Sequence, residues 1–207
     1  MSPTPISVIL VKPDGKRTIV NHKAATKPLR KKAADCGDCR PKVILFDGHE
    51  PFLSASLIRF ARKHGLPTVL DAGSVHPGTR ALLEQVDHVV ASEIFARDFT
   101  GTKDVPKALQ ELNRHAPSVV TTLGEKGLVW KNQDGTGRMR AFPIEAVDST
   151  GAGDAFHGAY AAGLAKGYNW EALLEHSSAV GALTCMKYGG RPAIPNAQKV
   201  LGFLKEI

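Results

Sequence analysis

The sequence predicts an α/β protein with a doubly wound, mostly parallel sheet. Short, fully apolar runs alternate with stretches of helical spacing along the 207 residues, and strands buried on both faces of a parallel sheet read as such runs. Polar or glycine-containing segments follow several of the runs, where α/β proteins bind their ligands. A composition of 43% hydrophobic and 23% charged residues is typical of a globular chain rather than a disordered one.

The first predicted element is a β-hairpin. Strand-like runs at Ile6–Val11 and Arg17–Asn21 flank the turn sequence P-D-G-K. A polar, basic stretch follows as far as about Arg40. We therefore expect residues 1–22 to form a hairpin and residues 23–207 to form the α/β domain.

Strands and helices alternate in the remainder of the chain. The predicted strands of the parallel sheet are Val43–Phe46, Thr68–Leu70, His88–Ala91 and Ser118–Leu123. The predicted helices between them are 51–65, 78–85 and one within Val105–His115. A second hairpin is expected from Val129–Lys131 and Met139–Phe142, and closing helices from Ala152–Lys166, Trp170–Met186 and Asn196–Lys205.

The segment from Asp148 to Asp154, D-S-T-G-A-G-D, places small residues and a carboxylate at the start of an apolar helix. Backbone N–H groups of Gly151, Ala152 and Gly153 can approach an anion closely, and a helix N-terminus favours negative charge. Asp154 would repel that anion, but it is useful if it takes a proton from a hydroxyl that attacks a phosphoryl group. An acidic residue that only complements the helix dipole is the alternative.

Four segments, in the same order along the chain, resemble ribokinase-like (PfkB) carbohydrate kinases. They are D-S-T-G-A-G-D-A-F-H-G-A, the turn T-L-G-E-K-G from Thr122, the triplet A-S-E ending at Glu93, and the loop K-Y-G-G-R-P-A-I-P from Lys187. The segment V-D-H-V-V-A-S-E-I-F-A-R is nearer to the ketohexokinase-like members, which favours a ketose. The resemblance implies ATP-dependent phosphorylation of a sugar hydroxyl, with Asp154 as the base and residues 151–153 as the anion hole.

The resemblance also implies a nucleotide site and, with it, Mg²⁺ carried by the ATP phosphates on few protein ligands. The implied nucleotide-binding residues are Thr122, Gly124, Gly127, Ser92, Glu93 and Ser178. Ser92 and Ser178 stand where the family often has Asn. The T-L-G-E-K-G segment is also compatible with a simple turn between two strands.

A cation site and a sugar-binding edge complete the implied site. The residues that resemble a monovalent-cation site, which K⁺ would occupy, are Asp148, Thr150, Thr184, Lys187, Gly189 and Ala193. A packing interface between two loops is the alternative there. Asp47 and His49 end an apolar strand and would face the sugar, or would only form a polar turn. Asp71 ends the next strand in the same position and would contact nucleotide phosphate through a metal ion or water.

The resemblance covers nearly the whole chain but only the later part of the family's usual length. The family's first strands, its Gly-Gly motif and part of its β lid would lie before Met1, so we expect open sheet edges. A homodimer through the lid or the exposed sheet edge is a hypothesis. A non-catalytic nucleotide-binding or assembly module, and a nucleoside or vitamin-precursor kinase on the same fold, stay open as alternatives.

The net charge and the cysteine content limit the classes of ligand and partner that we expect. The net charge of +7 comes in large part from a basic run without aromatic residues, which favours a solvated segment over nucleic-acid binding. Cys36 and Cys39 form a lone C-x-x-C and Cys185 is isolated, which favours loop cysteines over a zinc or redox site. With no apolar run of membrane-spanning length and no signal-peptide pattern, we expect a cytoplasmic protein whose partner is a small sugar.

Overall fold

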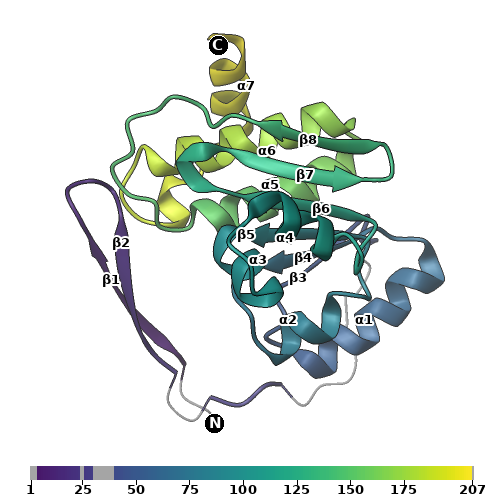
Figure 1. The fold of residues 1–207 in the computed structure, drawn as a ribbon. Helices are drawn as coiled ribbons and strands as arrows, with labels where there is room; N and C mark the ends of the chain where they lie inside the picture. The colour runs from purple at the N-terminus through teal and green to yellow at the C-terminus, as the bar shows by residue number, and fades with distance from the viewer. Residues whose placement is uncertain (1–3, 24–25, 30–39, 207) are drawn as a thin grey trace.

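The computed structural model describes residues 4–23, 26–29 and 40–206. Cys36 and Cys39 lie outside these residues, as does most of the basic stretch before Arg40. Two sheets are present in the described part of the chain. One is a two-stranded hairpin, and the other is a six-stranded sheet with the order β3-β4-β5-β6-β7-β8 (Figure 1).

The six-stranded sheet is mostly parallel. Its strands are β3 (Ile44–Phe46), β4 (Thr68–Ala72), β5 (His88–Ser92), β6 (Ser118–Thr122), β7 (Leu128–Asn132) and β8 (Gly135–Met139). The pairs from β3 to β6 are parallel, and β7 and β8 extend the sheet in antiparallel pairing. The carboxyl ends of four neighbouring strands therefore meet at one edge of the sheet.

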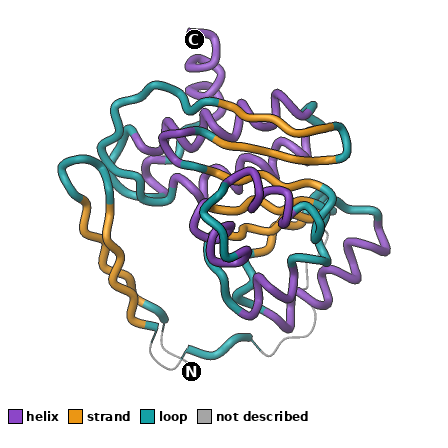
Figure 2. The backbone as a smooth tube through the Cα atoms, in the orientation of Figure 1, coloured by secondary structure: helices purple, strands orange, loops and turns teal. Residues whose placement is uncertain are grey.

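Helices cover both faces of this sheet, so the predicted doubly wound fold is confirmed (Figure 2). The helices are α1 (Pro51–His64), α2 (Pro77–Leu82), α3 (Glu93–Thr100), α4 (Val105–Leu112), α5 (Ala152–Lys166), α6 (Trp170–Cys185) and α7 (Ala197–Glu206), with short 3₁₀ turns at Gly124–Lys126 and Arg191–Ala193. Leu70 and Val89 pack under α1 to α4, whereas Val69 and Val90 pack under α5 and α6. Burial on both faces explains why the strands are continuous apolar runs.

Helix α3 is absent from the elements expected from the sequence. Ser92 is its N-cap, and the Ser92 hydroxyl accepts a hydrogen bond from the amide of Phe95 at 2.9 Å. Phe95 is fully buried in the core, and Gly101 ends the helix in a left-handed conformation. The Ser-Glu pair thus begins a helix.

Strand β8 begins earlier than the predicted Met139–Phe142. Asn132 pairs with Gly135, so only two residues reverse the chain, and the Asn132 side chain accepts hydrogen bonds from the amides of Asp134 and Gly135. Gly137 lies under the Trp130 ring, where a Cβ atom would come within 2.7 Å of the indole. Gly135 and Gly137 are therefore strand residues, and Gly137 makes room for the tryptophan.

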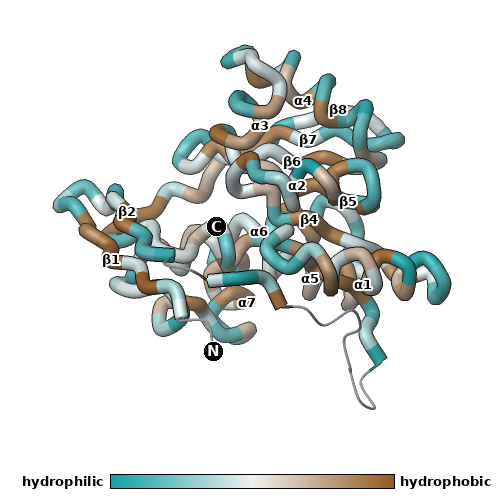
Figure 3. Tube along the Cα trace, turned by 90° about the horizontal axis from the view of Figure 1, so that it is seen from below, coloured by the Kyte–Doolittle hydropathy of each residue, from teal (hydrophilic) through white to brown (hydrophobic). Residues whose placement is uncertain are grey.

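The hairpin of β1 (Ile6–Val11) and β2 (Arg17–His22) is confirmed, and it stands apart from the large sheet. Every residue of both strands is exposed, including hydrophobic positions visible in Figure 3. Its turn is attached to the segment before α5: the Ser149 amide and hydroxyl both donate to the Gly15 carbonyl at 3.1 Å. Arg17 Nη1 donates to the Ser149 carbonyl and hydroxyl oxygens at 2.6 and 2.8 Å. No helix among the described residues has the length and apolar character needed to cross a membrane.

Candidate active site

The carboxyl ends of β3 and β4 and the first turns of α1 and α5 enclose a cavity of about 350 Å³. The lining residues are Leu45, Phe46, Asp47, Glu50, Leu53, Ser54, Leu57, Asp71, Asp154 and His157. Apolar side chains come from β3 and α1, and the acidic ones from the strand ends and α5. This is the edge at which α/β proteins bind ligands.

Asp154 presents an unengaged carboxylate to this cavity. It lies in the first turn of α5 and is exposed. It forms no side-chain hydrogen bond or ion pair with any other residue that the structure describes. A carboxylate that is held on a rigid helix and has no internal partner can accept a proton from a bound hydroxyl group.

The loop before Asp154 has the geometry of an anion site. Gly151 is the N-cap of α5 with a φ of 74°, a conformation that favours glycine. The Ala152 amide donates to the Ser149 carbonyl at 3.3 Å, but the amides of Gly151, Gly153 and Asp154 have no acceptor within the described chain. The sequence analysis assigned the anion hole to residues 151–153. Of these, Gly151 and Gly153 have free amides, and Asp154 adds a third.

Asp148 fastens this loop to the C-terminal loop. Its side chain is buried and accepts hydrogen bonds from the amides of Thr150 at 2.9 Å and Gly189 at 2.8 Å. Burial acts to raise the pKa of Asp148, but the hydrogen bonds from Thr150 and Gly189 outweigh it, so the pKa lies below its usual range. The amides of Val147 and Asp148 both donate to the Cys185 carbonyl. The anion loop is therefore rigid at its N-terminal side.

The other residues of the expected cation site lie around this fastening. Thr150 Oγ1 is buried without a hydrogen-bond partner in the described structure. Thr184 is also buried, but its hydroxyl donates to the Val180 carbonyl at 2.8 Å. Ala193 is buried and Lys187 is exposed. One unpartnered oxygen beside a buried carboxylate is compatible with a small cation, whereas the engaged Thr184 hydroxyl favours plain packing.

Two of the expected nucleotide residues have hydroxyl groups that already contact the protein. The Ser92 hydroxyl donates to the Gly73 carbonyl at 2.8 Å in addition to capping α3. The Thr122 hydroxyl lies 3.3 Å from the Ala91 carbonyl. Glu93 is 3.9 Å from Lys126 in an exposed ion pair. This pair links the start of α3 to the turn after β6.

The glycines of the T-L-G-E-K-G turn differ from each other. Both have positive φ angles, 60° at Gly124 and 90° at Gly127. A Cβ atom on Gly127 would overlap the Met139 carbonyl, so the close approach there is to the chain's own backbone. At Gly124 nothing lies within 4 Å of a Cβ position, and this side of the turn is open. Ser178 on α6 lies 3.8 Å from the Met139 sulfur.

Only one of the two residues expected at the sugar-binding edge lines the cavity. Asp47 lines the cavity, and its carboxylate accepts a hydrogen bond from the His49 amide at 2.9 Å. His49 is not among the lining residues. Its ring stacks on His76, with ring centroids 4.7 Å apart and planes 7° apart.

Asp71 and His157 both line the cavity. The sequence analysis named Asp71 as a strand-end carboxylate but gave His157 no role in the site. Their side chains lie 3.4 Å apart, from His157 Nδ1 to Asp71 Oδ2. Burial raises the pKa of Asp71, His157 opposes that shift, and the carboxylates of Asp154 and Asp47 add to it. The position of Asp71 at a strand end was a signal for that residue, but a single sequence offers none for its pairing with His157, because His157 lacks any ligand-like spacing and Asp71 is far away in the chain.

Free amides at a helix N-terminus, beside a free carboxylate at the carboxyl edge of parallel strands, define an α/β protein that can hold an anion next to a base. Residues 2–197 match the sequence model of the pfkB family of carbohydrate kinases, and the chain belongs to this family. The family resemblance and the fold class expected from the sequence are both confirmed.

Individual relatives agree with this assignment. A ribokinase from Haemophilus influenzae is 26% identical over 153 residues, which are 71% of this chain and 50% of that protein. The solved ribokinase of Thermotoga maritima has a TM-score of 0.79 at 25% identity and covers 98% of this chain and 70% of its own. Arabidopsis thaliana ribokinase, solved with ribose and ATP, has a TM-score of 0.78 at 23% identity, with coverages of 98% and 70%. The chain spans about half the length of the curated relatives that it matches.

Proposed function

We propose that this chain transfers the terminal phosphoryl group of ATP to a hydroxyl group of a sugar. The observation that carries the proposal is the unengaged Asp154 carboxylate beside the free amides of Gly151, Gly153 and Asp154. Asp154 takes the proton of the attacking hydroxyl, and the amides stabilise the charge that develops on the transferred group. Family membership supports this chemistry.

The nucleotide would approach from the side of β6. The open face of Gly124 and the exposed Glu93–Lys126 pair lie at the carboxyl end of β5 and β6. Thr122, Gly127, Ser92 and Ser178 surround them as supporting contacts. The Arabidopsis thaliana ribokinase was solved with ribose and ATP, which supports ATP as the phosphoryl donor in this proposal.

Mg²⁺ would enter with the ATP phosphates. In this proposal the ion is held mainly by phosphate oxygens and water, with few protein ligands. Bound Mg²⁺ would neutralise phosphate charge during transfer. The buried, unpartnered Thr150 Oγ1 beside Asp148 supports a monovalent cation such as K⁺ behind the anion loop.

The acceptor would bind in the cavity against Asp47 and Asp154, whose carboxylates can accept hydrogen bonds from sugar hydroxyls. A ketose stays the first choice, with ribose, fructose and a phosphorylated sugar as the other candidates. The ATP requirement fits the cytoplasm, the compartment expected from the sequence.

A homodimer through the hairpin is part of the proposal. Strands β1 and β2 expose Ile6, Val8, Leu10, Ile19 and Val20, and the outer edge of β3 has no partner strand in the described structure. Exposed apolar strands are ready-made interaction surfaces. Elution of the purified chain as a monomer at micromolar concentration would argue against the dimer.

The test is ADP release with Mg-ATP over a panel of ketoses, aldoses, phosphorylated sugars and nucleosides. The wild-type chain is compared with Asp154→Asn and, as a matched control, with Asp134→Asn in the exposed turn before β8. We expect acceptor-dependent turnover that Asp154→Asn lowers about 10²- to 10⁴-fold while Asp134→Asn leaves it unchanged.

Binding of ATP, measured separately by calorimetry, completes the test. We expect Asp154→Asn to keep its affinity for ATP. ATP binding without turnover by the wild-type chain would favour the alternative of a non-catalytic nucleotide-binding module. Turnover with nucleosides alone would favour a nucleoside kinase.

A further inference from the structure

His157 is a buried histidine that contacts three segments of the site. It lies one turn after Gly153 on α5, and its ring reaches across to strands β4 and β5. Nδ1 lies 2.6 Å from the Gly153 carbonyl and 3.4 Å from Asp71 Oδ2. Nε2 lies 3.0 Å from the Val90 carbonyl. Only 5% of the residue is exposed.

The Gly153 and Val90 carbonyls can only accept hydrogen bonds, and Asp71 is an acceptor when it is ionised. A carbonyl oxygen cannot donate a hydrogen bond, so each ring nitrogen must carry a proton to form its contact. A neutral imidazole has one N–H and one lone pair, and in this site the lone pair would face a carbonyl oxygen at hydrogen-bond distance. An unsatisfied contact of this kind in a buried place is costly. The geometry therefore selects the doubly protonated ring.

The surrounding charges favour the same form. Asp71 lies beside Nδ1, and the carboxylates of Asp47, Glu50 and Asp154 line the same cavity. No lysine or arginine is among its lining residues in the described chain. A buried cation needs a counter-ion, and Asp71 supplies it.

We propose that His157 is held as an imidazolium ion paired with Asp71 and that it is a positioning residue for the anion loop. The Gly153 carbonyl that it binds belongs to the same peptide unit as the free Asp154 amide. A charge-assisted hydrogen bond to that carbonyl orients the peptide and strengthens the amide on its other side as a donor. The bond to the Val90 carbonyl fixes the first turn of α5 against β5. This catalytic consequence rests on the proposed function, whereas the protonation state does not.

The protonation state is measured directly by ¹⁵N NMR of the histidine side chains in the wild-type chain. At pH 7 and 8 we expect both ring nitrogens of His157 to be protonated. His88 is the internal control: it is half-buried, burial lowers its pKa, and we expect one of its nitrogens to be unprotonated. A neutral His157 ring at pH 7 would overturn the proposal, whether or not the chain is active.

Asp71→Asn tests the counter-ion and leaves the histidine in place. We expect the His157 ring of this variant to lose its second proton by pH 8, at which the wild-type ring keeps it. An unchanged ring signal in Asp71→Asn would remove Asp71 from the proposal. Circular dichroism of the variant confirms that it is folded.

The kinetic readout separates positioning from general stability. We expect His157→Asn to lower kcat about 10- to 100-fold at saturating ATP, with the KM for ATP changed little, because misplaced amides weaken transition-state contacts more than ground-state binding. The control is His176→Gln, a half-buried histidine on α6, for which we expect wild-type kcat. A His157→Asn variant that is folded and has wild-type kcat would refute the positioning role.

Discussion

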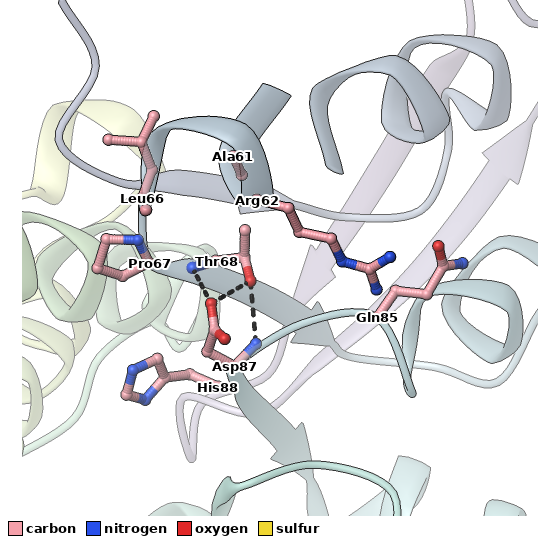
Figure 4. A pocket seen from close by; sticks show the side chains of 9 residues that line it. Ala61, Arg62, Leu66, Pro67, Thr68, Gln85, Asp87 and His88 are labelled. Carbon is pink, nitrogen blue, oxygen red and sulfur yellow. Dashed lines mark hydrogen bonds between the residues drawn. The ribbon is translucent and has the colours of Figure 1, made fainter. Parts of the chain in front are cut away.

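The two ends of the parallel strands each have a cavity lined by an aspartate and a histidine. The two cavities differ in how many of their polar groups already have hydrogen-bond partners within the protein. At the amino end, in a cavity of about 380 Å³, Asp87 accepts hydrogen bonds from the Thr68 amide at 2.8 Å and hydroxyl at 2.6 Å (Figure 4). The Thr68 hydroxyl in turn accepts one from the Asp87 amide. His88 Nδ1 lies 3.0 Å from the Tyr160 hydroxyl.

At the carboxyl end, in a cavity of similar size, the polar groups are left open. Asp154 has no internal partner in the described structure, and neither do three amides beside it. The two cavities are similar in volume, so volume does not distinguish the proposed site from the other cavity. The distinguishing property is polar capacity that the fold leaves unused at a rigid position.

The largest expected difference between the two ends is in the free energy of unfolding, when one glycine at each end is replaced by alanine. A Cβ atom on Gly78, at the start of α2, would overlap the Gly48 carbonyl next to Asp47 at the carboxyl end. We expect Gly78→Ala to lower the free energy of unfolding by about 3 kcal/mol and to reduce turnover, because two backbone segments must separate. Denaturant unfolding measures the loss.

The matched variant at the amino end is Gly65→Ala. Gly65 has a φ of 62° but nothing within 4 Å of its Cβ position. Only backbone strain opposes the substitution, and we expect a loss of about 1 kcal/mol with turnover unchanged. Equal losses for the two variants would contradict the claim that crowding at Gly78 is the cause.

Removal of the Asp87 side chain tests whether the amino end is purely structural. Asp87→Ala leaves the buried Thr68 amide without an acceptor, so we expect the free energy of unfolding to fall by about 2 kcal/mol. We expect kcat/KM to stay at its wild-type value. Glu84→Ala, which removes an exposed partner of His115, is the control and should change stability by less than about 0.5 kcal/mol. A lower kcat in Asp87→Ala would mean that the amino end contributes to the chemistry.

The smallest expected effect is on the loss of stability as the pH is lowered. Burial lowers the pKa of His88 below its ordinary value of 6.5, so the unfolded chain binds a proton there more readily than the folded one. Stability from this group is complete above pH 6.5 and falls as the pH decreases toward the folded pKa. We expect the loss of stability between pH 7.5 and 5.5 to be smaller in His88→Gln than in wild type, by about 1 kcal/mol. Identical pH slopes in thermal melts would contradict this assignment.

The features that could be predicted from the sequence are those that depend on residues close together in the chain. Continuous apolar runs predicted the parallel strands, and the small residues before Asp154 predicted the loop at the start of α5. Helix α3 was missed because Ser92 and Glu93 were interpreted as ligand contacts, although they are equally good residues for a helix start. Local chemistry alone does not decide between the two interpretations.

Features that depend on distant parts of the chain could not be predicted. His157 binds the Val90 carbonyl 67 residues away, and only the folded sheet brings these groups together. Gly127 is one of the residues expected to bind the nucleotide, and the sequence did not show that the backbone at Met139 approaches it closely. A glycine shows that something passes close by, but not what it is.

The hairpin of β1 and β2 contacts the segment before α5 through Gly15 and Arg17, at and next to its turn. The turn of the hairpin is held to Ser149 by hydrogen bonds, whereas both of its strands are exposed. Ser149 is two residues before Gly151. A second molecule bound to β1 or β2 would therefore be linked by these hydrogen bonds to the backbone just before α5.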